Sequence, residues 1–172
     1  EHQKYFHLVD DDGALLPNFI TISNIESTDP IQVIQGHERV IRPRLADAAF
    51  FYHEDLKTPL EARVPQLDAV VYQQQLGSLG DRTRRLVQLA GKLASVTGAD
   101  PALAERAALL SKTDLVTEIV QEFADLQGTA GYYYALNDSE PEAVANALGQ
   151  QYWPRFAGDR LPESTVACCL AL

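Results

Sequence analysis

The pattern of hydrophobic and polar positions changes near residue 30, and this change divides the chain into two parts. Before it, residues 4–9 and 19–25 are rich in β-branched and aromatic side chains, and Asp10-Asp11-Asp12-Gly13 lies between them. Asp-Gly between two such runs is typical of a hairpin turn, so the sequence predicts two strands joined at Gly13. Because a lone hairpin is not stable in water, we expect both strands to belong to a larger sheet.

From residue 30 onward, hydrophobic residues recur three or four positions apart, which is the spacing of a helix. Asp29-Pro30 and Asp100-Pro101 each predict a helix start, with an aspartate cap and a first-turn proline. Residues 139–142 predict a capping box, and Gly128 is the expected end of a further helix. The predicted apolar stripes are Leu60, Val64, Leu67 and Val71; Leu79, Leu86, Ala90 and Leu93; Leu103, Ala107 and Leu110; and Leu115, Ile119, Phe123 and Leu126. The predicted fold class is mainly α, an irregular helical bundle preceded by a β-hairpin.

The charge of the chain, a net −10, argues against a general nucleic-acid binder. Its distribution is uneven: residues 61–112 carry seven basic against five acidic side chains, whereas residues 113–172 carry two against nine. We therefore expect any contact with a polyanion in the middle segment or near Arg42 and Arg44. Arg155 and Arg160 lie in the acidic third and are expected to contribute little to such a contact.

Three cations on the predicted helix of the middle segment are candidates for RNA binding, namely Arg84, Arg85 and Lys92. Helical geometry turns Arg84 away from the apolar stripe and places Arg85 and Lys92, seven residues apart, on one flank. The alternative is that they only keep a helix face solvated. We expect Arg42-Pro43-Arg44 to follow a helix. Its arginines either bind RNA or hold the hinge between the two parts of the chain, and the hinge is favoured.

The remaining composition indicates a cytoplasmic protein. No apolar run approaches the ~20 residues that cross a membrane, and no signal peptide is visible. Cys168 and Cys169 are adjacent, so we expect them to be reduced rather than bridged. Three consecutive tyrosines, residues 132–134, cannot share one helix face, so one or two of them are expected in the core. The chain begins at Glu1 and contains no Met, which favours an internal piece of a longer protein.

Residues 84–115 resemble the first half of an HD-domain phosphohydrolase, in which one helix is followed by another that ends in Ala-Leu-Leu-His-Asp. The resemblance implies that the metal-binding His-Asp pair falls on Ser111 and Lys112, and an earlier His on about Arg82. A lysine ammonium would sit where the metal ion should bind, which is electrostatically prohibitive. The resemblance therefore implies a degenerate HD-type domain with neither a metal site nor a catalytic residue.

Arg82 lies at the edge of the predicted apolar face, where the histidine of the HD superfamily would point inward. A buried arginine needs a carboxylate partner, and Asp114 and Glu118 are the candidates.

Several short segments together resemble the β subunit of bacterial two-subunit glycyl-tRNA synthetases. They are residues 2–6, 19–25, 42–48, 50–51, 73–77, 109–115, 121–123, 126–128 and 152–159. The resemblance implies that residues 1–45 are the C-terminal piece of an editing-like domain, of the kind found in phenylalanyl-tRNA synthetase. It also implies that residues 46–172 are an HD-like helical domain truncated at its C-terminus.

The same resemblance implies a non-catalytic part of a glycine–tRNA ligase, which contributes to tRNA binding and to assembly with an α subunit. The α subunit would use ATP and Mg, this piece would hold no cofactor, and the parent would be an α2β2 tetramer that binds glycine tRNA. Two alternatives come from other classes. A metal-dependent HD-type phosphohydrolase is opposed by Ser111 and Lys112. A hydrolytic editing module is opposed by the lack of an arguable Cys-His or Ser-His-Asp arrangement.

Overall fold

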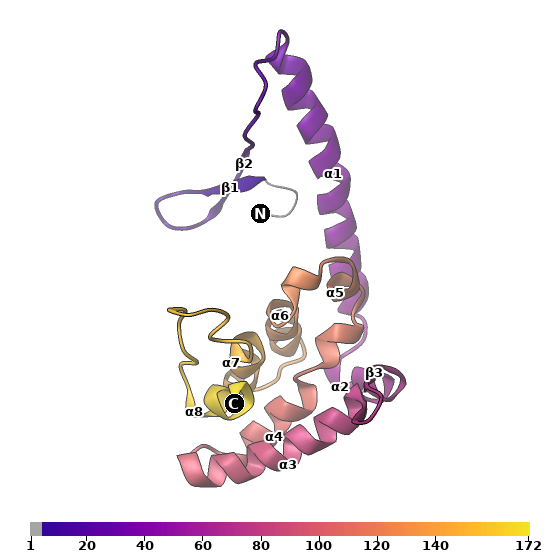
Figure 1. The fold of residues 1–172 in the computed structure, drawn as a ribbon, viewed down its shortest axis with the longest axis vertical. Coiled ribbons are helices and arrows are strands. Elements are labelled where there is room, and N and C mark those ends of the chain that lie inside the picture. Colours follow the sequence, from indigo (N-terminus) through magenta and orange to yellow (C-terminus); the bar gives the residue numbers. More distant parts are fainter. Residues whose placement is uncertain (1–4) are drawn as a thin grey trace. The chain divides into compact units, whose positions relative to one another are not determined.

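The computed structural model describes residues 5–172, and the chain divides into two compact units, Glu1–Arg44 and Leu45–Leu172. We call them unit 1 and unit 2 and describe each by itself (Figure 1). Two predictions, the strand start at Lys4 and the resemblance at residues 2–4, fall outside the described residues. The editing-like and HD-like identities of the two parts stay predictions.

Unit 1 contains the predicted hairpin, with β1 at Phe6–Val9 and β2 at Leu15–Ile20. The strands pair antiparallel, with Phe6 opposite Ile20. Gly13 has a φ of +82°, a conformation that glycine adopts without strain in the turn. The predicted position of the second strand was wrong, because β2 begins directly after the turn. It accommodates Pro17, since an edge strand does not need every N–H.

Helix α1 spans Pro30–Asp55, and its start at Asp29-Pro30 is confirmed. The Asp29 carboxylate accepts a hydrogen bond from the backbone N–H of Gln32 at 3.3 Å. The expected helix end before Arg42-Pro43-Arg44 was wrong, because the helix runs through Pro43. A proline inside a helix removes one backbone hydrogen bond, and α1 nevertheless continues from Pro43 to Asp55.

Unit 2 continues through α2 (Leu60–Arg63), the 3-10 helix η2 (Val64–Ala69), β3 (Val71–Gln73) and β4 (Gly77–Ser78). The helix predicted from Leu60 to Val71 is therefore broken, and Val71 instead pairs with Ser78 in a short hairpin. Pro65 lies in the first turn of η2, where its missing N–H is tolerated. This hairpin leads directly into α3.

Helix α3 (Leu79–Thr97) is the long helix predicted for the middle segment. A capping box begins it: the Asp81 N–H donates to Ser78 Oγ at 3.1 Å, and the Ser78 N–H donates to Asp81 Oδ2 at 2.9 Å. Gly98, in the left-handed conformation with φ +76°, ends it. Helix α4 (Pro101–Leu110) follows, and its predicted start is confirmed because Asp100 accepts from the Ala102 N–H at 2.8 Å.

The remaining elements are shorter. They are η3 (Thr113–Val116), α5 (Glu118–Glu122), η4 (Ala124–Leu126), α6 (Thr129–Asn137), α7 (Glu142–Gln150) and α8 (Thr165–Ala171). Two predictions were wrong here. Gly128 precedes α6 rather than ending a helix, because its N–H is held by a buried carboxylate. Helix α7 has no side-chain cap, because its N-cap residue is Pro141, whose side chain has no hydrogen-bond acceptor.

The core of unit 2 is built largely from small side chains. Helices α3 and α4 lie side by side (Figure 1), and α6, α7 and α8 pack on one another. The larger buried residues are Leu60, Leu110, Val144 and Leu148, and seven alanines have no exposed surface: Ala94, Ala107, Ala108, Ala135, Ala145, Ala147 and Ala167. The mainly α fold class with an N-terminal hairpin is confirmed. Within residues 5–172 no helix has both the length and the apolarity that crossing a membrane requires.

Candidate functional site

The residues at the degenerate HD positions lie inside unit 2, after the end of α4. Ser111 is buried, and its hydroxyl donates to the Ala108 carbonyl at 2.8 Å. The Lys112 ammonium is also buried and donates to Gln151 Oε1 at 2.6 Å and to the Tyr152 hydroxyl at 3.0 Å. It lies 4.4 Å from the centre of the Tyr152 ring. Neutral oxygens and an aromatic face therefore solvate this cation in place of water.

The surroundings shift the titration of two groups in this cluster. Burial, and then the nearby Arg82 charge, lower the pKa of Lys112 from 10.5 to about 8, against the opposing effect of Asp114. Burial raises the pKa of the Asp114 carboxyl, although the Gly128 N–H donates to it at 2.6 Å. Asp114 Oδ1 has no hydrogen-bond partner among the described residues. The cluster is polar and buried, but it contains no nucleophile paired with a base.

Arg82 does not have the partner expected for it. Its guanidinium lies over the Tyr72 ring, 4.4 Å from the ring centre. No ion pair joins it to Asp114 or Glu118 in the part of the chain that the structure describes. The physical reason is the hairpin of β3 and β4, which brings Tyr72 beside α3 and which the helical pattern did not predict.

Metal-ligating side chains do not gather in the described part of the chain. No group of three or more His, Cys, Asp or Glu side chains is placed to hold an ion among residues 5–172. His2 lies outside these residues, and His37 Nδ1 instead lies 2.9 Å from the Tyr5 hydroxyl within unit 1. Cys168 and Cys169 are free thiols on α8, as predicted.

Arg84 and Arg85 fasten helix α3 to the segment before it. Arg84 Nη2 lies 2.8 Å from Asp81 Oδ1 and 2.9 Å from Asp68 Oδ1. The hydrogen bond that Arg84 donates to Asp81, together with those from Ser78, lowers the pKa of Asp81 to about 2. Arg85 Nη2 donates to the Leu76 carbonyl at 3.0 Å. Two carboxylates therefore neutralise the charge of Arg84, whereas the charge of Arg85 meets only a neutral acceptor.

The other predicted RNA-binding residues lie on α3 and α1. Lys92 is exposed on α3, about two turns beyond Arg85. On α1, Arg42 is exposed and lies 3.9 Å from the Glu38 carboxylate, and Arg44 is half-buried. The predicted RNA-binding cations therefore lie on two helices, α1 and α3.

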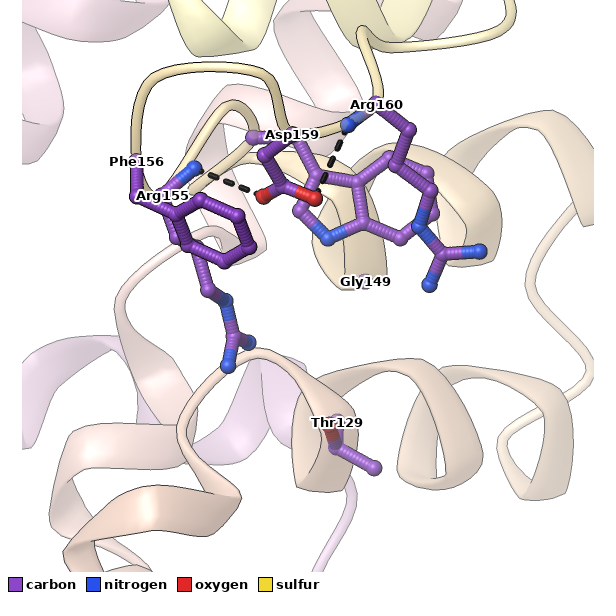
Figure 2. A pocket seen from close by; sticks show the side chains of 7 residues that line it. Thr129, Gly149, Arg155, Phe156, Asp159 and Arg160 are labelled. Carbon is purple, nitrogen blue, oxygen red and sulfur yellow. Dashed lines mark hydrogen bonds between the residues drawn. The ribbon is translucent and has the colours of Figure 1, made fainter.

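A pocket of about 270 Å³ lies at a loop whose two arginines the sequence analysis did not select for RNA binding. Figure 2 shows its lining, which consists of Thr129, Gly149, Trp153, Arg155, Phe156, Asp159 and Arg160. The Asp159 carboxylate accepts the backbone N–H groups of Arg155 and Arg160, each at 2.8 Å, and these bonds lower its pKa. The Arg160 guanidinium stacks on Trp153, 3.5 Å from the ring centre.

A local signal for this pocket was present in the sequence. Residues 152–160 contain three aromatic side chains and two arginines, and sites that bind single-stranded nucleic acid combine these two kinds of side chain. The charge count over residues 113–172 concealed it, because that count weights every acidic residue equally.

The three tyrosines of α6 have different surroundings. Tyr134 is buried and its hydroxyl donates to Asp55 Oδ2 at 3.1 Å, whereas Tyr132 is half-buried and Tyr133 is exposed. Desolvation and then the Asp55 charge raise the pKa of Tyr134. The expectation that one or two of them belong to the core is confirmed.

A family model and two known proteins similar to this chain carry the same subunit name. A family model described as the glycyl-tRNA synthetase β subunit matches residues 1–172. A glycine–tRNA ligase β subunit from Marinobacter nauticus is 59% identical over 172 residues, which are 100% of this chain and 25% of the relative. One from Actinobacillus pleuropneumoniae is 58% identical over 170 residues, 99% of this chain and 25% of the relative. The chain spans about a quarter of the length of these relatives. It belongs, as its segments predicted, to the glycyl-tRNA synthetase β-subunit family.

Proposed function

We propose that this chain is a non-catalytic part of a glycine–tRNA ligase β subunit, which contributes to tRNA binding and to assembly with an α subunit. The match over the whole of residues 1–172 carries the proposal. The parent enzyme would be a cytoplasmic α2β2 tetramer that charges glycine tRNA, with ATP and Mg used by the α subunit. This chain itself would hold no cofactor.

The proposal that this chain is non-catalytic is supported by the two residues at the degenerate HD positions. The Ser111 hydroxyl is bound to a carbonyl of its own helix, and the Lys112 ammonium is bound to Gln151 and Tyr152. A fixed cation at this position repels a metal ion. The sequence also contains no Gly-rich loop that would hold the phosphates of ATP.

We therefore expect residues 1–172 alone to show no glycine-dependent exchange of pyrophosphate into ATP. The same assay on the complete α/β synthetase is the positive control. Exchange above background by residues 1–172, abolished in a preparation of the Lys112→Met variant, would show that this unit performs chemistry and would contradict the proposal.

The proposed tRNA contact involves helix α3, with Arg84, Arg85 and Lys92, and helix α1, with Arg42 and Arg44. Arg85 and Lys92 are the better phosphate ligands on α3, because neither is neutralised by a carboxylate among the described residues. Arg84 is bound to Asp68 and Asp81 and would have to exchange them for phosphate. The test is therefore directed at Arg85 and Lys92.

Replacing Arg85 and Lys92 by glutamine in the complete synthetase is expected to weaken tRNA binding about tenfold. Each lost phosphate contact should reduce the salt dependence, the slope of log K against log salt, by roughly 0.7–0.9. Lys57→Gln is the matched control, because Lys57 is exposed and its ammonium binds Glu54. Filter binding at several salt concentrations measures both quantities. Unchanged affinity and slope in the double variant would show that these cations only solvate α3.

A further inference from the structure

The arginines of unit 2 differ in what their guanidinium groups bind. Most of them bind the protein itself: Arg63 binds Asp55, Arg84 binds Asp68 and Asp81, Arg85 binds Leu76, and Arg106 binds Glu61 and Glu140. The guanidinium groups of Arg155 and Arg160 make neither a hydrogen bond nor an ion pair with any residue that the structure describes. Both line the same pocket. Their planar N–H groups are therefore available to an anion with several oxygens.

The loop that carries these two arginines is held in place without using their side chains. The Asp159 carboxylate binds the backbone N–H groups at both positions. Stacking on Trp153 orients the Arg160 guanidinium while leaving its N–H edge for a ligand. Figure 2 shows both guanidinium groups extending from the loop on the side where Gly149 and Thr129 lie. The site is thus organised before any ligand binds, which lowers the entropy lost on binding.

An exposed aromatic ring lines the same pocket as the two cations. Phe156 lines the pocket, and 68% of its surface is exposed. A large apolar side chain at this exposure gains nothing from the core of the domain, and its flat face suits a nucleobase. Stacking of a base on an aromatic side chain is favourable for every base, because each has a π face.

Four of the nine acidic residues in the C-terminal third bind groups that do not line this pocket. The Asp114 carboxylate binds the Gly128 N–H, Asp138 binds the Leu60 N–H, Glu140 binds Arg106 and Glu163 binds Gln150. Among the residues that line the pocket, Asp159 alone is acidic, and it faces two arginines. The local charge is therefore positive, although residues 113–172 as a whole are acidic.

We propose that this pocket binds RNA, with Arg155 and Arg160 donating to the oxygens of one phosphodiester and Phe156 stacking on a neighbouring unpaired base. The inference rests on the proposed function, because tRNA is the RNA that such a β subunit would bind. Two guanidinium groups without an ion pair among the described residues, in a pocket that also contains an exposed ring, fit a phosphate joined to a base. An acidic peptide would bind the two cations but would not stack on the Phe156 ring. A free phosphate would not stack on that ring either.

The experiment compares variants of the pocket in the complete α/β synthetase. Arg155→Gln and Arg160→Gln are each expected to weaken tRNA binding about threefold to tenfold and to lower the salt slope by roughly 0.7–0.9. Phe156→Ala is expected to weaken binding about tenfold with an unchanged salt slope, because stacking releases no counterions. Lys57→Gln is again the single-charge control. Thermal unfolding of each variant verifies its fold, which should persist because Asp159 holds only backbone groups.

The outcomes separate this site from the proposed function. Unchanged affinity and slope in Arg155→Gln/Arg160→Gln would overturn the pocket proposal, whereas a simultaneous loss in Arg85→Gln/Lys92→Gln would leave the proposed function standing. Unchanged tRNA binding in both double variants would overturn both. Loss of α/β association on size-exclusion chromatography with unchanged tRNA affinity would assign the pocket to a protein partner and overturn RNA binding. Competition by inorganic phosphate as strong as by tRNA fragments would identify a free-anion site and overturn the base contact.

Discussion

Replacing Asp55 by alanine is expected to destabilise the 172-residue chain by about 3–5 kcal/mol, the largest effect of any single substitution considered for it. The Asp55 carboxylate is buried and accepts from Arg63 Nη2 at 3.1 Å and from the Tyr134 hydroxyl at 3.1 Å. It also accepts from the backbone N–H groups of Glu118 and Ile119, at 3.0 and 2.9 Å. Alanine would leave a buried guanidinium and the first turn of α5 without their acceptor.

Urea unfolding, followed by circular dichroism, measures this effect. Tyr134→Phe removes only one of the four donors and is expected to reduce the free energy of unfolding by about 1 kcal/mol. Asp55→Leu combined with Arg63→Met removes both charges and should recover part of the loss. Glu54→Ala is the control, because Glu54 pairs with Lys57 at the surface. Equal urea midpoints for Asp55→Ala and Glu54→Ala would show that the buried Asp55 carboxylate does not stabilise the fold.

The stability of the chain is expected to rise between pH 8 and about pH 10, and Lys112→Met is expected to abolish that rise. The pKa of Lys112 is lowered from 10.5 to about 8, so in this interval the unfolded chain binds a proton that the folded chain does not. Stability increases with pH wherever the unfolded state binds more protons. The difference between the two pKa values corresponds to on the order of 3 kcal/mol.

Urea unfolding at a series of pH values measures this rise. Burial raises the pKa of Tyr152 and of Tyr134, but those groups act in the opposite direction only above about pH 10, where unfolded tyrosines lose protons. Lys92→Met, at an exposed lysine of α3, is the matched control and should retain the rise. A pH dependence shared by the wild type and Lys112→Met would show that the Lys112 ammonium is as stable inside the protein as in water.

What the sequence could predict depended on how local each signal is. The starts of α1 and α4 were predictable, because an aspartate and the proline after it determine the first turn by themselves. The role of Gly128 was not, because it depends on Asp114, which lies 14 residues earlier and holds its N–H. The helical stripe through Val71 was misleading for the same reason, since Val71 pairs with Ser78.

For the candidate sites, too, local signals were predictable and contacts between separate elements were not. The family was recognisable from short segments, and the HD-type resemblance selected Ser111 and Lys112, which the structure shows to be buried. The contact between Arg82 and Tyr72 could not, because it requires a hairpin whose two strands have three and two residues. The pocket at Arg155 and Arg160 had a local signal in residues 152–160, but the net charge of residues 113–172 concealed it, because a net charge does not contain the positions of the acidic residues.

The alanine-rich core has a consequence for which sequence changes this unit tolerates. Alanine has no side-chain rotamers to lose on folding, and its small volume allows neighbouring helices to approach closely. Trimming such a core to glycine removes little buried surface, whereas adding one methylene at Ala94 or Ala107 meets a neighbour at once. Natural variation in the core should therefore be asymmetric, with exchange among Ala, Gly and Ser common and enlargement rare. Neutral drift in this unit is directed to its surface and loops.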